Sequence, residues 1–142
     1  MKKTLTSIVS VLVVAVFMLT LVSCGNKVDV KGLWEDATYT RDKTFGNGDT
    51  TVQLEVKVED QSVTFTIKTD KKILGDALLE HDLIAGEEGP YGLYVKKVNG
   101  ITADYDKTQT YWALKKNGKD LMTGVDMTEI TDGEHYEFVY TK

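Results

Sequence analysis

Cysteine, proline and histidine are scarce in this sequence, and the scarcity of cysteine excludes whole classes of structure. The 142 residues include one cysteine, Cys24, one proline, Pro90, and two histidines, His81 and His135. A single cysteine cannot close a disulfide within the chain or build a cysteine-rich zinc centre. The fold must therefore be stabilised by its hydrophobic core alone.

Residue patterns typical of catalytic centres are also missing. None of the four serines lies in a Gly-x-Ser-x-Gly elbow, and neither histidine has a partner at metal-ligand spacing. We expect both histidines to be exposed, His81 on a helix and His135 at the start of the last strand. Asp104 and Asp106 lack the following glycine and glutamate of a calcium-binding loop, so a solvated turn is expected there. The sequence thus predicts a non-enzyme with no metal site and no required cofactor.

Acidic residues outnumber basic ones by 22 to 17, which gives a net charge of −5. Lys2 and Lys3 lie in an N-terminal leader, and without them the chain carries a net charge of −7. An acidic surface argues against a nucleic-acid partner and against adhesion to anionic lipid headgroups.

The leader has the organisation of a secretory signal. A basic start is followed by an almost wholly apolar run, Ile8 to Val22, and then by Ser23, Cys24 and Gly25. The cysteine after small residues resembles the lipobox of bacterial lipoproteins, which implies cleavage before Cys24 and lipid on that residue. The alternative is an uncut membrane anchor, for which the run is short because a span needs about 20 residues.

We therefore expect three segments along the chain. These are a signal peptide over residues 1–23, a lipidated cysteine with a short polar tether over 24–32, and one domain over 33–142. The predicted location is extracytoplasmic, with lipid on Cys24 holding the protein to the bacterial cell membrane. The 119 residues from Cys24 onward suffice for one domain with its own core.

Alternating hydrophobicity predicts strands over most of this domain. Residues 52–58 and 63–67 flank a turn at Glu59–Gln61 and predict a hairpin. A tight turn is expected before it at Gly46–Asp49, and an earlier strand at Trp34–Thr40. Further strands are expected at 93–98, at 110–115 with an Asn117–Gly118 turn after it, and at 135–141 with Tyr136, Phe138 and Tyr140 on one face.

The period changes once, between residues 74 and 83, where apolar residues recur at helical spacing and Gly86 follows. Two strands, one short helix and then more strands predict an α+β fold with the helix packed on one sheet. A β-grasp-like antiparallel or mixed sheet around that helix is the expected architecture.

Short motifs in the second half occur in an order that resembles a known family. They are Ile73–Leu79, Gly89–Gly92, Val98–Ile101, Tyr111–Trp112, Gly124–Val125 and Asp132–Glu134. The order resembles the C-terminal β-domain of the transcobalamin and intrinsic factor carriers, and more closely the free-standing bacterial domains of that type found in surface lipoproteins. The resemblance covers about Thr51 to Tyr140. It implies a β-grasp-like domain that binds a soluble ligand, with cobalamin or another corrinoid as the leading candidate.

The resemblance and the residues together single out a candidate ligand-binding set. Backbone amides of Gly89, Pro90, Tyr91 and Gly92 are candidates for contacting ligand amides, although the same four residues also fit a plain turn. Tyr111 and Trp112 point to opposite faces of a strand, so one is buried and the other is free to stack on a planar ring.

Residues 124–125 are expected in an irregular strand, and residues 132–134 in a turn before the final strand. Tyr91, Tyr94, Tyr105 and Tyr111 occur in the same region of the sequence.

Three functions remain open. The first is a lipid-anchored protein that captures a small ligand for a transporter or partner domain; the second is a cell-surface module that binds a protein or glycan; the third is a weak enzyme. An aromatic-lined concavity near Gly89 and Tyr111 favours the first. A flat apolar patch or a long unpaired edge strand favours the second. Titratable groups converging in a cleft favour the third.

Overall fold

Residues 26–142 are described by a computed structural model, and the predicted signal peptide and lipidated Cys24 lie outside them. The strands are β1 (Lys43–Gly46), β2 (Thr50–Val58), β3 (Gln61–Thr69), β4 (Ile84–Gly89), β5 (Gly92–Val98), β6 (Ile101–Thr102), β7 (Tyr111–Lys116), β8 (Lys119–Asp120) and β9 (His135–Thr141). The helical segments are α2 (Leu74–Leu79), α3 (Tyr105–Thr108) and two 3₁₀ turns, η1 (Gly32–Asp36) and η2 (Val125–Met127).

The predicted hairpin is confirmed and forms the centre of the fold. Strands β2 and β3 pair in antiparallel register from Thr50↔Thr69 to Val58↔Gln61. The alternating valines, leucine, phenylalanine and isoleucine of both strands are fully buried, while the intervening polar residues face outward. One face of this pair therefore provides much of the hydrophobic core.

The larger sheet has six strands in the order β1-β3-β2-β9-β7-β8. Strand β9 pairs parallel to β2 and antiparallel to β7, so the last strand lies in the interior of the sheet. The predicted inward face of β9 is confirmed, because Tyr136 and Phe138 are buried and Tyr140 packs against the core. The predicted Asn117–Gly118 turn joins β7 to β8, with both residues at positive φ as this turn type requires.

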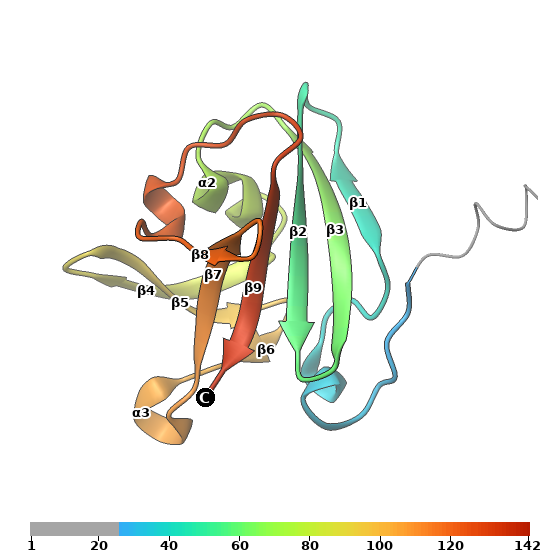
Figure 1. Cartoon of the computed structure of the whole chain (residues 1–142), viewed down its shortest axis with the longest axis vertical. Helices are drawn as coiled ribbons and strands as arrows, with labels where there is room; N and C mark the ends of the chain where they lie inside the picture. The colour runs from blue at the N-terminus through green and yellow to red at the C-terminus, as the bar shows by residue number, and fades with distance from the viewer. Residues whose placement is uncertain (1–25) are drawn as a thin grey trace, which may run out of the picture.

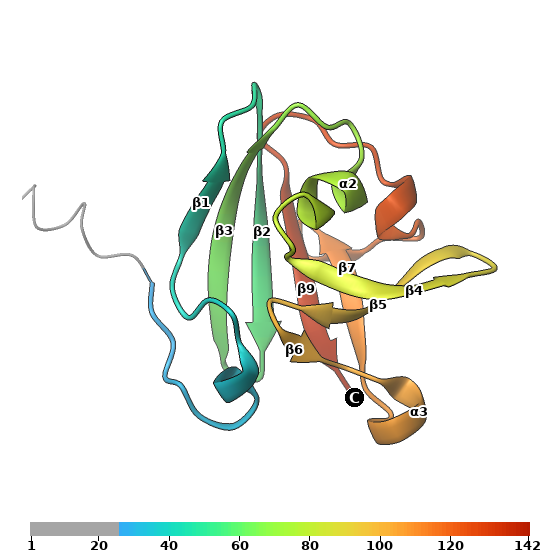
Figure 2. The ribbon, with the colours of Figure 1, turned by 180° about the vertical axis from the view of Figure 1, so that it is seen from behind.

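A second layer covers only one face of the six-stranded sheet. It consists of α2 and a three-stranded sheet in the order β4-β5-β6. Figure 2 shows α2, β4, β5 and β6 across this face, whereas in Figure 1 the opposite face of β2, β3 and β9 has no element in front of it. The described residues thus form a β-rich α+β structure in two layers, with two sheets rather than one.

The helix predicted over residues 74–83 is present but ends early. It ends at Leu79, and Asp82 takes a positive φ of 54° that turns the chain into β4. Leu83 is nevertheless buried, because its N–H returns to the Leu78 carbonyl at 3.0 Å. The periodic pattern therefore marked Leu74, Ala77, Leu78 and Leu83 correctly as buried, but it included the exposed Leu79 and misplaced the end of the helix. A second short helix, α3, was not predicted.

The strand predicted at Trp34–Thr40 is wrong. Residues 32–36 form the 3₁₀ turn η1, which Gly32 enters at a φ of +59°. Trp34 is buried here as a single anchor, and its Nε1–H donates to the Val58 carbonyl at 3.4 Å. Trp34 is the only buried residue of η1, so there is no alternation of buried and exposed residues here. The strand prediction was wrong because it assumed such an alternation.

The irregular strand expected at Gly124–Val125 is also absent. Gly124 precedes the 3₁₀ turn η2, and Val125 is buried beside α2. The turn expected at Asp132–Glu134 is confirmed, and Gly133 takes a φ of +87° in it. Within residues 26–142, no helix has the length and apolar character needed to cross a membrane.

Candidate functional site

The Gly89–Gly92 segment forms the tip of the β4–β5 hairpin. Gly89 and Gly92 are paired across the two strands, and Tyr91 is 92% exposed at the turn between them. Gly92 has a φ of +101°, and a Cβ there would lie 2.4 Å from the Asp126 Oδ2. That same oxygen accepts the Leu93 N–H at 3.0 Å, so the tip of the hairpin is held at η2 through Asp126.

Tyr111 and Trp112 lie on opposite faces of β7, as their adjacency in a strand predicts. Trp112 is 7% exposed, and its Nε1–H donates to the Ile101 carbonyl at 3.2 Å. Tyr111 is 40% exposed. Tyr111 is therefore the exposed member of the pair.

A shallow groove of about 140 Å³ runs between the β4–β5 hairpin and β7. Its lining is mainly apolar and consists of Leu93, Tyr94, Val95, Trp112, Leu114, Thr123, Gly124, Val125 and Phe138. The rings at its floor are held edge to face, with the Trp112 centroid 6.4 Å from that of Phe138. Trp112 also meets Tyr140 at 5.5 Å. These edge-to-face contacts stabilise the floor of the groove.

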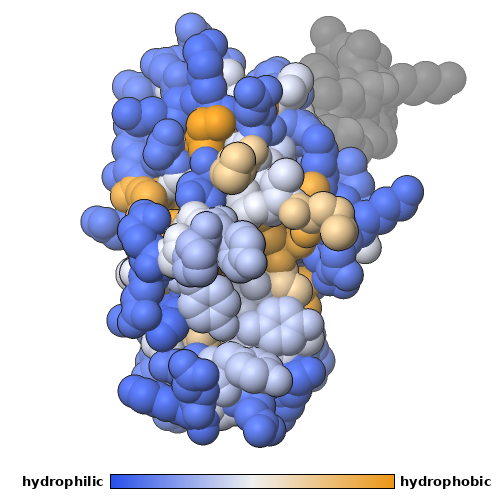
Figure 3. Space-filling view, turned by 90° about the vertical axis from the view of Figure 1, so that its left-hand side faces the viewer, coloured by the Kyte–Doolittle hydropathy of each residue, from blue (hydrophilic) through white to orange (hydrophobic). Residues whose placement is uncertain are grey.

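Four tyrosines of this part of the chain are exposed, and one of them, Tyr94, lines the groove. The four tyrosines at 91, 94, 105 and 111 are 92%, 43%, 56% and 40% exposed, and Met122 is also exposed. Figure 3 shows this side of the molecule, where pale aromatic rings and apolar atoms gather in a band bordered by hydrophilic residues. An aromatic face of this kind is suited to contact with a flat, largely apolar ligand.

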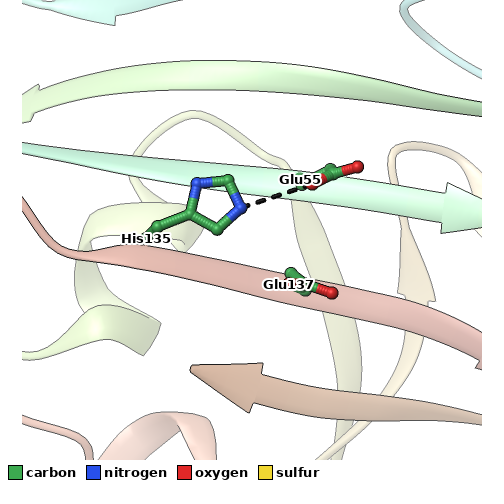
Figure 4. Close-up of side chains that lie close together, drawn as sticks. All are labelled: Glu55, His135 and Glu137. Carbon is green, nitrogen blue, oxygen red and sulfur yellow. Dashed lines mark hydrogen bonds and ion pairs between the residues drawn. The ribbon is translucent and has the colours of Figure 1, made fainter. Parts of the chain in front are cut away.

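A second cluster of functional side chains lies on the uncovered face of the six-stranded sheet. Glu55 on β2 is aligned with Glu137 on β9, and Gln53 is aligned with His135. The His135 Nε2 lies 3.3 Å from the Glu55 Oε1, and donor atoms of Glu55, His135 and Glu137 all lie within 4.8 Å of one another. Figure 4 shows His135 directed toward Glu55, with Glu137 beside them on the same strand as His135.

Lys57 compensates the negative charge of this cluster. Its Nζ lies 3.0 Å from the Glu137 Oε2 and 3.9 Å from the Glu55 Oε2. The hydrogen bond to Glu137 raises the pKa of Lys57 above its ordinary value, against the opposing effect of burial. Because the Lys57 side chain is 40% exposed, it can leave the carboxylates for water at little cost.

The prediction that His81 is exposed is wrong. Its side chain is 20% exposed, its ring packs on Phe45 with centroids 5.2 Å apart, and its Nε2 is buried without a hydrogen-bond partner. It borders a polar hollow of about 290 Å³ between the β1–β2 loop and the end of α2. The reason is that α2 ends before His81 and the turn after it folds the ring back onto β1.

His135 is likewise half-buried rather than exposed, with 32% of its side chain accessible. Its expected lack of partners does not hold in three dimensions, because Gln53 and Glu55 come from a strand about 80 residues earlier. The sequence showed that the polar residues at 53, 55 and 57 alternate with the apolar residues of the predicted strand and so face outward. No local signal predicted that these residues would pair with His135 and Glu137.

Asp104 has a structural role in the described chain. Its Oδ1 accepts the Asp106 N–H at 3.1 Å and so caps α3, and its Oδ2 lies 3.9 Å from the Lys96 Nζ. The turn expected at Asp104 and Asp106 is instead the short helix α3, and both residues lie outside the two candidate clusters.

Two solved structures are similar to this chain. A protein from Ruminococcus gnavus ATCC 29149, described as "a putative metal binding protein", is similar over 66% of this chain and 98% of its own, with 33% identity and a TM-score of 0.63. Haptocorrin in complex with Cbi is similar over 69% of this chain, with 21% identity and a TM-score of 0.54. No curated protein matches the sequence.

The likeness to haptocorrin concerns the fold alone, and it supports the predicted resemblance to the transcobalamin-like C-terminal domain. This chain spans 26% of haptocorrin. Residues 72–142 match the family described as "Domain of unknown function (DUF4430)". The match runs from just before α2 through β9 and so includes the β4–β5 hairpin, β7 and His135. The chain therefore belongs to the DUF4430 family.

Proposed function

We propose that this protein binds a small ligand with a flat, largely apolar face, and that a corrinoid such as cobalamin is the leading candidate. The observation that carries the proposal is the aromatic groove between the β4–β5 hairpin and β7, with Trp112 at its floor and Tyr94 at its wall. Tyr111 lies on the face of β7 opposite to Trp112 and does not line the groove. The descriptions of the two similar structures, one as metal binding and one in complex with Cbi, support a binding role.

The groove is one side of a binding site. Its volume of about 140 Å³ is well below the range of about 300–1,000 Å³ typical of sites that enclose a ligand. A ring-shaped ligand would therefore lie on the groove with its other face uncovered. We infer that a second surface, from a partner domain, a transporter or another copy of this chain, covers that face.

The proposed cellular role is capture outside the cytoplasm. Lipidation of Cys24 would hold the domain at the bacterial cell membrane, and the short tether after it would keep the groove near a transporter. The support for this part is the arrangement of the leader in the sequence.

The proposal is tested by isothermal titration of the full chain, kept in non-ionic detergent, with cobalamin and with cobinamide. Saturable heat at micromolar concentration is expected for at least one of them. A Tyr94→Ala variant should weaken binding about fivefold, since stacking contributes about 1 kcal/mol per ring. Trp112 is left intact because it belongs to the core.

Leu79→Ala is the matched control, because Leu79 is an exposed apolar residue on α2 that does not line the groove. Its affinity should equal that of the parent protein. Equal affinities for the parent and the Tyr94→Ala variant would show that the ligand does not use the aromatic groove. The absence of heat with both corrinoids would overturn the corrinoid assignment.

A second candidate function is binding of a protein or glycan at the cell surface. Strand β4 favours it, because β4 is the outer strand of the small sheet and five of its six residues are exposed. An unpaired edge of this kind can accept a further strand from a partner. Glu87 and Glu88 place negative charge on that edge, so a basic partner segment would fit it best.

A further inference from the structure

The polar cluster on the uncovered face of the large sheet carries an inference that goes beyond small-ligand binding. We propose that Glu55, His135 and Glu137 form a binding site for a divalent transition-metal ion such as Zn²⁺. The site is separate from the aromatic groove, because β9 directs Phe138 toward the groove and its neighbour Glu137 to the opposite face.

The spacing of two of the donors already matches that of ligands on one ion. Two ligands at about 2.0–2.1 Å from a tetrahedral zinc ion stand about 3.3 Å apart. The His135 Nε2 and the Glu55 Oε1 are 3.3 Å apart. The Glu137 carboxylate lies within 4.8 Å of both and completes the set after a small rotation of its side chain. Three protein donors leave one position for water or another molecule.

Gln53 orients the imidazole in the way that metal-binding histidines require. The Gln53 Oε1 lies 3.3 Å from the His135 Nδ1, where it can accept an Nδ1–H. With the ring proton on Nδ1, the Nε2 lone pair would face the Glu55 carboxylate, which is itself an acceptor. A cation between the two atoms satisfies both acceptors, and a hydrogen bond behind the imidazole is the usual support of a metal ligand.

Lys57 fills the role of the cation when no metal is bound. Its ammonium group neutralises Glu137 and reaches Glu55, so the two carboxylates tolerate their proximity on the folded sheet. A divalent ion would replace this single charge, and the half-exposed lysine would turn toward water. The other basic side chain beside Glu137, Lys115, is paired with Asp120 at 3.5 Å and is not required to move.

The donor set selects the kind of metal. One imidazole nitrogen and two carboxylate oxygens suit Zn²⁺ and neighbouring transition metals, whereas Ca²⁺ and Mg²⁺ prefer oxygen ligands throughout. The probe is therefore Zn²⁺, with Mg²⁺ as the counter-probe.

The test is isothermal titration of ZnCl₂ into the full chain in non-ionic detergent, purified without a histidine tag. Cys24 is replaced by Ser in every sample, so that no thiol contributes to binding. We expect one saturable Zn²⁺ site. His135→Gln and Glu137→Gln should each weaken it at least tenfold, and Mg²⁺ should give no saturable heat at the same concentrations.

Two further variants make the result specific. His81→Gln removes the other histidine and should leave the affinity unchanged, which makes it the matched control for His135→Gln. Lys57→Met removes the competing ammonium and should tighten Zn²⁺ binding about tenfold. If the cluster served only as an ion pair, the affinity for Zn²⁺ would not increase in this variant. Thermal unfolding of each variant verifies that it is folded.

Absence of a saturable zinc site would overturn the proposal, and so would equal affinity in the parent and the His135→Gln variant. Loss of binding in His81→Gln alone would also overturn it, because the ion would then occupy the hollow beside α2. Cobalamin binding is measured in a separate titration, so this inference and the proposed function fail independently.

Discussion

The two faces of the six-stranded sheet differ in what covers them and in what their side chains do. On the covered face, Trp112 and Phe138 pack edge to face and contribute to both the core and the aromatic groove. On the uncovered face, Glu55, Lys57 and Glu137 form a charged network in contact with water. Strand β9 belongs to both faces, because its residues alternate between them.

This difference shows how a small domain can combine a stable core with polar chemistry. Burial of the aromatic face contributes to stability in proportion to the apolar area removed from water. The charged face contributes little, because partly exposed ion pairs are worth about 0–1 kcal/mol. The uncovered face is therefore free to carry charged and metal-binding groups without loss of the fold.

The strongest test of the comparison uses two adjacent residues of β9. Phe138→Ala should lower the free energy of unfolding by about 3–5 kcal/mol, because it opens a cavity in the core. Glu137→Gln should lower it by about 1 kcal/mol or less, because the uncompensated Lys57 is half-exposed. Urea unfolding of both variants measures the difference. Similar losses for the two would show that the faces are not energetically distinct.

A second test concerns the hairpin that forms one wall of the groove. Gly92→Ala should cost about 2–3 kcal/mol, because it combines a left-handed backbone with a clash against Asp126. Gly118→Ala is the matched control, since Gly118 also has a positive φ but has open space around it. It should cost about 1 kcal/mol. Thermal unfolding compares the two variants. Equal losses of stability would show that the clash with Asp126 does not contribute to the effect of Gly92→Ala.

The acid stability of the protein should depend on Glu134, which joins β9 to its surroundings. Burial tends to raise the pKa of this carboxyl, but hydrogen bonds from Lys116, from the Thr131 N–H and from Tyr136 lower it below the ordinary value of 4.5. A lowered folded pKa means that Glu134 stabilises the fold above about pH 4.5 and loses this contribution as the pH falls below that value.

Unfolding measured from pH 7 to pH 3 tests this expectation. Glu134→Gln should be less stable than the parent at pH 7, and the difference should shrink as the pH falls below 4.5. A difference that is constant over this range would mean that the charge of Glu134 does not contribute.

The smallest effect is expected for Lys57→Met on the uncovered face. Without added metal, its free energy of unfolding should stay within about 1 kcal/mol of the parent, because the lost ion pairs are partly solvated. Chemical denaturation at low and high salt measures it. A larger loss, reduced by high salt, would show that Lys57 is needed to keep the two carboxylates together.

Several elements could be predicted because their signal is local. The β2–β3 hairpin, the Asn117–Gly118 turn and the inward face of β9 all follow from alternation and turn chemistry within a few residues. The elements that were wrong depend on distant contacts. Trp34 is held in η1 by the end of β2, and His81 is folded back onto Phe45 of β1.

The candidate sites divide in the same way. The sequence singled out Tyr111 and Trp112 and stated that they lie on opposite faces, but only the neighbouring strands decided that Trp112 is the buried one. The groove also needed the β4–β5 hairpin to dock beside β7 through Asp126, which contacts residues more than 30 positions earlier.

The sequence by itself therefore determined the β2–β3 hairpin, the strands β5, β7 and β9, the acidic composition and the expectation of a lipidated leader, because composition and short-range periodicity carry that information. Only the tertiary structure decided that β9 returns to pair in parallel with β2. Parallel strands are not joined by a tight turn, so no short run of turn residues in the sequence predicts their pairing. It is this pairing that brings Glu55 to His135 and Glu137 across about 80 residues of chain.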